Sequence, residues 1–188
     1  MNRREAIQRV AMLVGGSVIG ANLFLEGCTR PATKTVESLF EAENTDFLGD
    51  LAEAILPETD TPGAKEAGVG EFIPVMVRDT YTEEDQKVFV EGLNGVDARS
   101  KKEFDKNFQD LSAEEKLEFV NMLDKEAKEH ESNKEEDEKS HFFTMLKQLT
   151  LTGFFTSEVG MTKALRYVKI PGKFDGNYPY KKGDRAFA

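Results

Sequence analysis

Few residues of this chain have side chains that could do chemistry. Among its 188 residues there are one cysteine, Cys28, and two histidines, His130 and His141. A metal site would need the histidines brought together with a carboxylate in fixed geometry. Both stand close to acidic residues such as Glu129 and Glu131. We interpret them as surface histidines at helix ends, and we predict no metal site in this chain.

Asp60 is the remaining candidate, as a general base. It lies in Thr59-Asp60-Thr61-Pro62-Gly63-Ala64, where an aspartate that caps a turn is the commoner role. Gly68-Val69-Gly70 lacks the third glycine and the preceding strand of a dinucleotide-binding fingerprint. The chain also lacks the Cys-x-x-Cys-His motif of c-type haem proteins, a phosphate-binding loop and a His-Glu-x-x-His motif. We therefore predict no catalytic residue and no cofactor in this chain.

The N-terminus has the layout of an export signal. Arg3, Arg4 and Arg9 give it a basic start, and the sixteen residues from Val10 to Leu25 carry no charge. This run is shorter than the roughly 20 residues that a membrane-spanning helix needs. Residues 2–7, which include the Arg3-Arg4 pair, resemble a twin-arginine signal, the route for proteins exported already folded. Residues 1–27 are thus predicted to be a signal segment, with Arg3 and Arg4 as its recognition pair.

Cys28 directly follows this segment. A lone cysteine cannot form an internal disulfide, and it is ordinarily a small buried apolar residue. Here Leu25-Glu26-Gly27-Cys28 resembles a bacterial lipobox, with the cysteine at the cleavage point. We expect an exported, periplasmic protein, anchored to the membrane by lipids on Cys28. A cytosolic amphipathic helix or a retained membrane anchor is the alternative.

The rest of the chain predicts a helical domain. Residues 28–44 are predicted to be a tether, and residues 45–169 to be the domain itself. Apolar residues at helical spacing predict helices at about 45–56, 69–80, 141–155 and 157–167. The segment 141–155 is the most apolar, and we expect it to be the central helix. Thr82 and Ser112 stand before acidic residues as helix starts. The apolar face of the first helix continues through Val88, Phe89, Leu93 and Val96 and extends towards Phe104 and Phe108, and the second helix bears the apolar residues Leu117, Val120, Leu123 and Ala127. No segment alternates as a strand does, so the fold class is all-α, a compact helical bundle.

Residues 170–188 differ from the domain before them. Their prolines and glycines forbid a long helix, yet Phe174, Tyr178, Tyr180 and Phe187 are aromatic. Residues 163–188 contain seven basic and two acidic side chains, whereas the whole chain has a net charge of −10. That acidity argues against nucleic acid as a partner. We predict an extended C-terminal arm that either folds back over the bundle or binds a partner.

Three segments together resemble the gluconate 2-dehydrogenase subunit 3 family. The first is Ile55-Leu56-Pro57 with Thr59-Asp60-Thr61-Pro62-Gly63-Ala64, Ala67-Gly68-Val69 and Phe72-Ile73. The second is Gly153-Phe154-Phe155-Thr156-Ser157-Glu158-Val159-Gly160-Met161. The third comprises Leu165, Tyr167, Pro171-Gly172 and Arg185-Ala186-Phe187-Ala188. The resemblance covers residues 46–188 and the signal.

This resemblance implies a small, non-catalytic subunit of a membrane-associated dehydrogenase that acts on gluconate or another sugar. Its partners would be a glucose-methanol-choline-type flavoprotein, which holds the FAD, and in some complexes a cytochrome c that carries haem. The small subunit would assist the export, maturation or anchoring of the flavoprotein. Aromatic and arginine side chains supply much of the energy of interfaces. We expect partner binding at Thr61, Pro62, Phe174, Tyr178, Arg185 and Phe187.

A free-standing envelope lipoprotein that binds a small molecule or a metal is the rival hypothesis. The genes beside this one would separate the two. A neighbouring flavoprotein gene without a signal peptide favours the accessory subunit.

Overall fold

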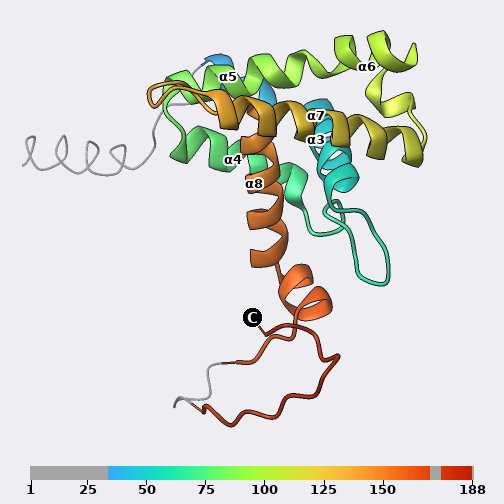
Figure 1. Cartoon of the computed structure of the whole chain (residues 1–188), viewed down its shortest axis with the longest axis vertical. Helices are drawn as coiled ribbons and strands as arrows, with labels where there is room; N and C mark the ends of the chain where they lie inside the picture. The colour runs from blue at the N-terminus through green and yellow to red at the C-terminus, as the bar shows by residue number, and fades with distance from the viewer. Residues whose placement is uncertain (1–33, 170–174, 188) are drawn as a thin grey trace, which may run out of the picture. The chain divides into compact units, whose positions relative to one another are not determined.

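The computed structural model describes residues 34–169 and 175–187 of the chain. Within these ranges the secondary structure is helical, apart from one isolated bridge between Arg166 and Phe187. The elements, in chain order, are α2 (Lys34–Glu37), η1 (Ser38–Phe40), α3 (Ala42–Ile55), α4 (Val69–Thr80), α5 (Glu83–Asn94), α6 (Val96–Phe104), η2 (Phe108–Asp110), α7 (Ala113–Asn133), α8 (Phe142–Thr156) and η3 (Gly160–Ala164) (Figure 1). The prediction of an all-α, compact helical bundle is confirmed.

Helices α5, α7 and α8 each begin where a side chain accepts a hydrogen bond from a backbone amide of the first turn. The Thr82 hydroxyl accepts a hydrogen bond from the Asp85 amide at 3.2 Å, which caps α5. At α7, Ser112 and Glu115 form a reciprocal capping box. Such a cap typically contributes about 1 kcal/mol of helix stability. The imidazole of His141 caps α8 by accepting from the Phe143 amide at 3.2 Å.

Helix α8 lies at the centre of the bundle. It packs against α3, α4, α5 and α7, and in Figure 1 it runs crosswise beneath α5 and α7. Its phenylalanines Phe142, Phe143 and Phe154 are buried, with no more than 4% of any side chain exposed. Burial of an aromatic or aliphatic side chain stabilises the fold by about 1.5–3 kcal/mol. The prediction that this apolar segment forms the central helix is therefore confirmed.

Helices α3 and α4 approach each other closely at Gly70. A Cβ atom on Gly70 would lie 2.5 Å from the carbonyl oxygen of Thr45 and 3.0 Å from the amide nitrogen of Gly49. Both are backbone atoms of α3, so they cannot rotate away as a side chain could. Glycine at position 70 therefore sets how near the two helices come.

Three boundaries differ from the sequence predictions. Residues 34–44, the described part of the predicted tether, form α2, η1 and the first turn of α3, and Val36 and Leu39 are buried. Their apolar side chains fill the core, which gives this segment a fixed position. The apolar face expected to continue from Val88 beyond Val96 is divided at Gly95 into α5 and α6. The last helix ends at Ala164 rather than at Tyr167, because Arg166 pairs with the end of the chain.

Candidate partner-binding segments

The predicted site residues divide by whether the structure describes them. Arg3, Arg4, Cys28 and Phe174 lie outside the described residues. Their roles in export, lipidation and partner binding stay predictions. Thr61 and Pro62 lie in the loop between α3 and α4, and Tyr178, Arg185 and Phe187 lie in the C-terminal arm.

The loop after α3 is held by one carboxylate. Both oxygens of Glu53 accept backbone hydrogen bonds, from the amide of Glu58 at 2.7 Å and from the amide of Lys65 at 2.8 Å. Gly63 is buried directly beside this carboxylate, where any Cβ atom would collide with it. Thr61 and Pro62 are half-buried beside it. Carboxylates that accept backbone amides make strong hydrogen bonds, so the loop has a defined shape.

The arm is closed at its base by Arg166. The backbone amide of Arg166 donates to the Ala186 carbonyl at 2.7 Å, and its guanidinium Nη1 donates to Asp184 Oδ2 at 3.0 Å. The guanidinium also lies over two aromatic rings, 4.7 Å from the centroid of Phe187 and 5.5 Å from that of Tyr178. Each such cation–π contact is worth about 0.5–1 kcal/mol at an exposed site. These contacts join Arg166, which precedes the arm, to Tyr178 and to the C-terminal end of the arm.

Arg185 has a role inside the chain. Its Nη1 atom donates to the carbonyl oxygen of Thr162 at 3.3 Å and also to that of Lys163. Both carbonyls lie at the C-terminal end of η3, where helical carbonyls lack intrahelical partners and favour a cation. Arg185 therefore fastens the arm to η3. Whether it also binds a partner stays a prediction.

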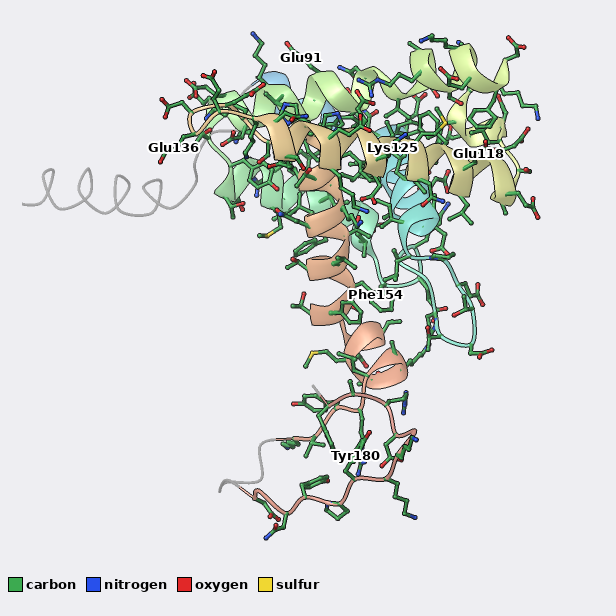
Figure 2. All side chains as sticks on the ribbon, viewed as in Figure 1. Glu91, Glu118, Lys125, Glu136, Phe154 and Tyr180 are labelled. Carbon is green, nitrogen blue, oxygen red and sulfur yellow. The ribbon has the colours of Figure 1, made fainter. Side chains whose placement is uncertain are left out.

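The described part of the arm presents its aromatic side chains to solvent. Tyr180 is 63% exposed, Phe187 43% and Tyr178 41%. Tyr180 is labelled on the C-terminal arm in Figure 2. Every residue from 175 to 187 is exposed, and none of them belongs to the hydrophobic core. The sequence left two roles open for the arm, folding back over the bundle and binding a partner. Its described part does not cover the hydrophobic core.

An ion pair joins the end of the loop between α3 and α4 to η3. Glu66, just beyond the loop, pairs with Lys163 of η3 at 2.6 Å, although the two are 97 residues apart in the chain. Lys163 also supplies one of the carbonyls that Arg185 binds. Lys163 of η3 therefore contacts both the loop, through Glu66, and the arm, through Arg185.

The two histidines lie near each other, with ring centroids 5.7 Å apart. His141 Nε2 faces Glu126 at 3.7 Å and His130 Nε2 faces Glu138 at 3.4 Å. Burial lowers the pKa of His141, and the neighbouring Glu126 opposes that effect. Within residues 34–169 and 175–187, no three His, Cys, Asp or Glu side chains are grouped as a metal ion requires. Asp60 is exposed at the loop surface.

Two residues that organise these segments were not found from the sequence. Arg166 is one of the seven basic residues at positions 163–188, and Glu53 is one of several charged positions on the helix predicted at 45–56. Their partners, Asp184 and the Lys65 amide, lie 18 and 12 residues away in the chain. Spacing on one helix cannot indicate contacts of that kind.

In the part of the chain that the structure describes, no helix is both long and apolar enough to cross a membrane. No curated protein and no solved structure shows significant similarity to the chain. The protein-family model for Gluconate 2-dehydrogenase subunit 3 matches residues 42–172. That range includes Glu53 on α3, the loop with Thr61, helix α8, and Arg166. The chain therefore belongs to the gluconate 2-dehydrogenase subunit 3 family.

Proposed function

We propose that this chain is the non-catalytic small subunit of an FAD-dependent dehydrogenase complex in the bacterial envelope. The family name denotes a subunit of gluconate 2-dehydrogenase, which implies partner dehydrogenase subunits. In this proposal the partner is a flavoprotein of the glucose-methanol-choline type, which holds the FAD and oxidises gluconate or a related sugar. A cytochrome c subunit would accept the electrons in complexes that contain one.

The C-terminal arm is the observation that carries this proposal. It exposes Tyr178, Tyr180 and Phe187, while Asp184 and Phe187 are held by Arg166. Exposed aromatic side chains are enriched at protein interfaces. A loop that is already ordered loses less conformational entropy when it binds. The arm therefore has the composition and the order of a preformed binding surface.

The N-terminal sequence supports a role in export. A flavoprotein acquires FAD in the cytoplasm, so it must cross the membrane folded. The twin-arginine route carries folded cargo, and one signal serves two chains that are already bound to each other. We propose that Arg3 and Arg4 direct the export of both subunits, and that lipids on Cys28 then hold the complex at the membrane.

Replacing both Arg3 and Arg4 by lysine tests this function. Lysine keeps the positive charge but removes the planar guanidinium group. We expect this chain and the FAD-loaded dehydrogenase activity to be retained together in the cytoplasmic fraction. The matched control is Arg9→Lys, the same change in the same segment but outside the arginine pair. Export of both subunits should be normal in that control.

The decisive outcome is the position of the flavoprotein when this chain is retained. If the flavoprotein still reaches the envelope at its normal level, the two chains are not exported as one complex. The small subunit would then act after export, as a stabiliser or a membrane tether. If the two chains do not associate in any compartment, the accessory-subunit proposal itself is wrong.

A further inference from the structure

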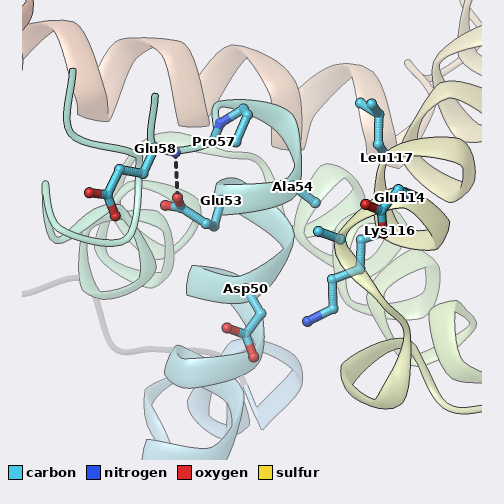
Figure 3. Close-up of a pocket in the computed structure, with 9 residues that line it drawn as sticks. Asp50, Glu53, Ala54, Pro57, Glu58, Glu114, Lys116 and Leu117 are labelled. Atoms are coloured by element: carbon cyan, nitrogen blue, oxygen red, sulfur yellow. Dashed lines mark hydrogen bonds between the residues drawn. The ribbon is translucent and has the colours of Figure 1, made fainter. Parts of the chain in front are cut away.

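A hollow of about 430 Å³ lies between the C-terminal half of α3 and the first turn of α7 (Figure 3). Its apolar lining comes from Ala54 and Pro57 on the α3 side and from Ala113 and Leu117 on the α7 side. Pro57 is also the first residue of the loop that Glu53 holds. The hollow is therefore continuous with one of the two candidate partner-binding segments.

Leu117 is the most exposed large apolar side chain of α7, with 52% of its surface accessible. We grouped it with the apolar face of Val120 and Leu123, which are 5% and 2% exposed. At 3.6 residues per turn, Leu117 lies roughly a quarter of a turn from the centre of that face. It borders the hollow instead of the core, and that grouping was wrong. A single exposed leucine is ordinary, but this one adjoins an apolar depression.

The charged part of the lining carries excess negative charge. It contains four carboxylates and one ammonium group, Lys116. Asp50 is neutralised by Lys65 at 2.6 Å, and Glu53 is occupied by backbone amides. Glu58 and Glu114 form no ion pair with any described residue, and both are exposed. The rim therefore lacks cations beside two of its acidic groups.

We propose that this hollow binds a basic segment of the flavoprotein partner. The segment places an apolar side chain against Leu117 and Pro57, and a lysine or arginine beside Glu58 and Glu114. This inference rests on the proposed function, because the occupant is the partner subunit. A small-molecule site would need buried polar groups that converge on the ligand, whereas the two free carboxylates here are exposed at the rim. Their arrangement suits the core and charged rim of a protein interface.

The test measures the affinity of the full chain for the purified, FAD-loaded flavoprotein. Leu117→Lys removes the apolar contact and adds a positive charge that repels a basic segment, and we expect it to weaken binding by about tenfold or more. The double variant Glu58→Lys/Glu114→Lys reverses the charge of the rim and should also weaken binding by about tenfold at low salt. The loss from the charge reversal should shrink as the salt concentration rises, since salt screens exposed charges.

Two variants on the same helix serve as matched controls. Met122→Lys makes the same kind of change at a side chain that is 40% exposed and does not line the hollow. Glu129→Lys reverses a charge that lies fifteen residues beyond Glu114, or about 22 Å along α7 at a rise of 1.5 Å per residue. Both should bind the flavoprotein as the parent does. Circular dichroism and thermal unfolding identify any variant that fails to fold.

Photo-crosslinking identifies the occupant. A benzoylphenylalanine at position 117 should form an adduct with a segment of the flavoprotein that contains lysine or arginine. An adduct with a second copy of this chain, or with an acidic segment, would overturn the inference.

The possible failures are separable. If the parent chain binds the flavoprotein but the Leu117 and rim variants bind equally well, the hollow is not the docking site and the proposed function stands. If the parent chain itself does not bind the flavoprotein, the proposed function fails.

Discussion

At the scale of single residues, two polar side chains hold neighbouring helices together. Gln86 of α5 is 1% exposed, and its amide nitrogen lies 3.0–3.1 Å from the carbonyl oxygens of Val77, Arg78 and Tyr81 at the end of α4. Asp124 of α7 lies 2.6 Å from both Lys128, one turn along the same helix, and Lys147 of α8. Each side chain makes a contact with a second helix that its own helix cannot provide.

Gln86→Met should lower the free energy of unfolding by about 1–3 kcal/mol. Methionine has a similar volume but no donor, so the carbonyls at the end of α4 lose this amide as a partner while packing is largely kept. Chemical denaturation measures the loss. Gln148→Met on the exposed face of α8 is the control, and it should change stability by less than about 0.5 kcal/mol. Equal effects in the two variants would show that the buried amide contributes nothing.

Asp124 should make stability depend on pH. Hydrogen bonds from Lys128 and then Lys147 lower the pKa of Asp124 below its ordinary value. A carboxyl with a lowered folded-state pKa stabilises the fold above its unfolded pKa, about 3.9, and this stabilisation is lost as the pH falls through the folded-state value. At pH 7, Asp124→Asn should cost less than about 1 kcal/mol, because Lys128 is largely exposed and Lys147 is partly exposed.

The measurement compares the parent and Asp124→Asn by denaturant unfolding from pH 7 downward. The difference between them should disappear below the folded-state pKa of Asp124. Asp137→Asn is the control, because Asp137 forms no ion pair within the described ranges. A difference between the parent and Asp124→Asn that is constant down to the lowest pH would contradict the ion-pair explanation.

At the scale of helices, the crossing of α3 and α4 requires glycine at position 70 but not at position 49. A Cβ on Gly70 would meet the backbone of α3, whereas a Cβ on Gly49 would meet only Lys65 Cγ at 3.7 Å, an ordinary contact. The two glycines therefore provide a matched pair. Both lie inside helices, so alanine has the same intrinsic advantage at each.

Gly70→Ala should destabilise the protein by about 1–3 kcal/mol, because α3 and α4 must move apart. Gly49→Ala should be neutral or stabilising by up to about 1 kcal/mol, from helix propensity alone. Thermal or denaturant unfolding of the two variants beside the parent decides the matter. Equal stability of the two variants would mean that the crossing is not limited by backbone contact.

At the scale of the whole molecule, the bundle and the C-terminal arm should be separable. Deleting residues 173–188 removes the described residues 175–187, none of which belongs to the hydrophobic core. We expect the shortened chain to keep its helical circular dichroism and nearly its full melting temperature. Co-purification with the flavoprotein should be lost, because the exposed aromatic side chains are gone.

A second variant separates the shape of the arm from its composition. Arg166→Leu leaves every arm residue in place but removes the guanidinium that contacts Asp184, Tyr178 and Phe187. It should weaken flavoprotein binding less than the deletion does, and limited proteolysis should cut its arm faster. If the deletion unfolds the bundle instead, the arm stabilises the fold and its aromatic residues are not free for a partner.

The sequence alone determined the helical class, most of the helices and the family. Residues 69–80 were predicted as a helix with the bounds of α4, and the caps at Thr82 and Ser112 were predicted with their roles. These features depend on residues within a few positions of one another, through periodicity, capping and turn chemistry. The family was identified in the same way, from short motifs, and the match to residues 42–172 confirms it. The predictions for Arg3, Arg4 and Cys28 also come from sequence, and they remain untested.

Only the tertiary structure decided which of these residues meet. Arg166 binds the C-terminal end of the arm, Glu53 holds the loop, and Gly70 leaves room for the backbone of α3. Each of these contacts reaches atoms that lie 12 or more residues away in the chain. Leu117 shows the same limit, because its spacing predicts a buried residue while the position of α3 leaves it beside an open hollow. Helical periodicity specifies which side of a helix is apolar. It does not specify how far the neighbouring helix covers that side, because this depends on the packing of side chains from the whole chain.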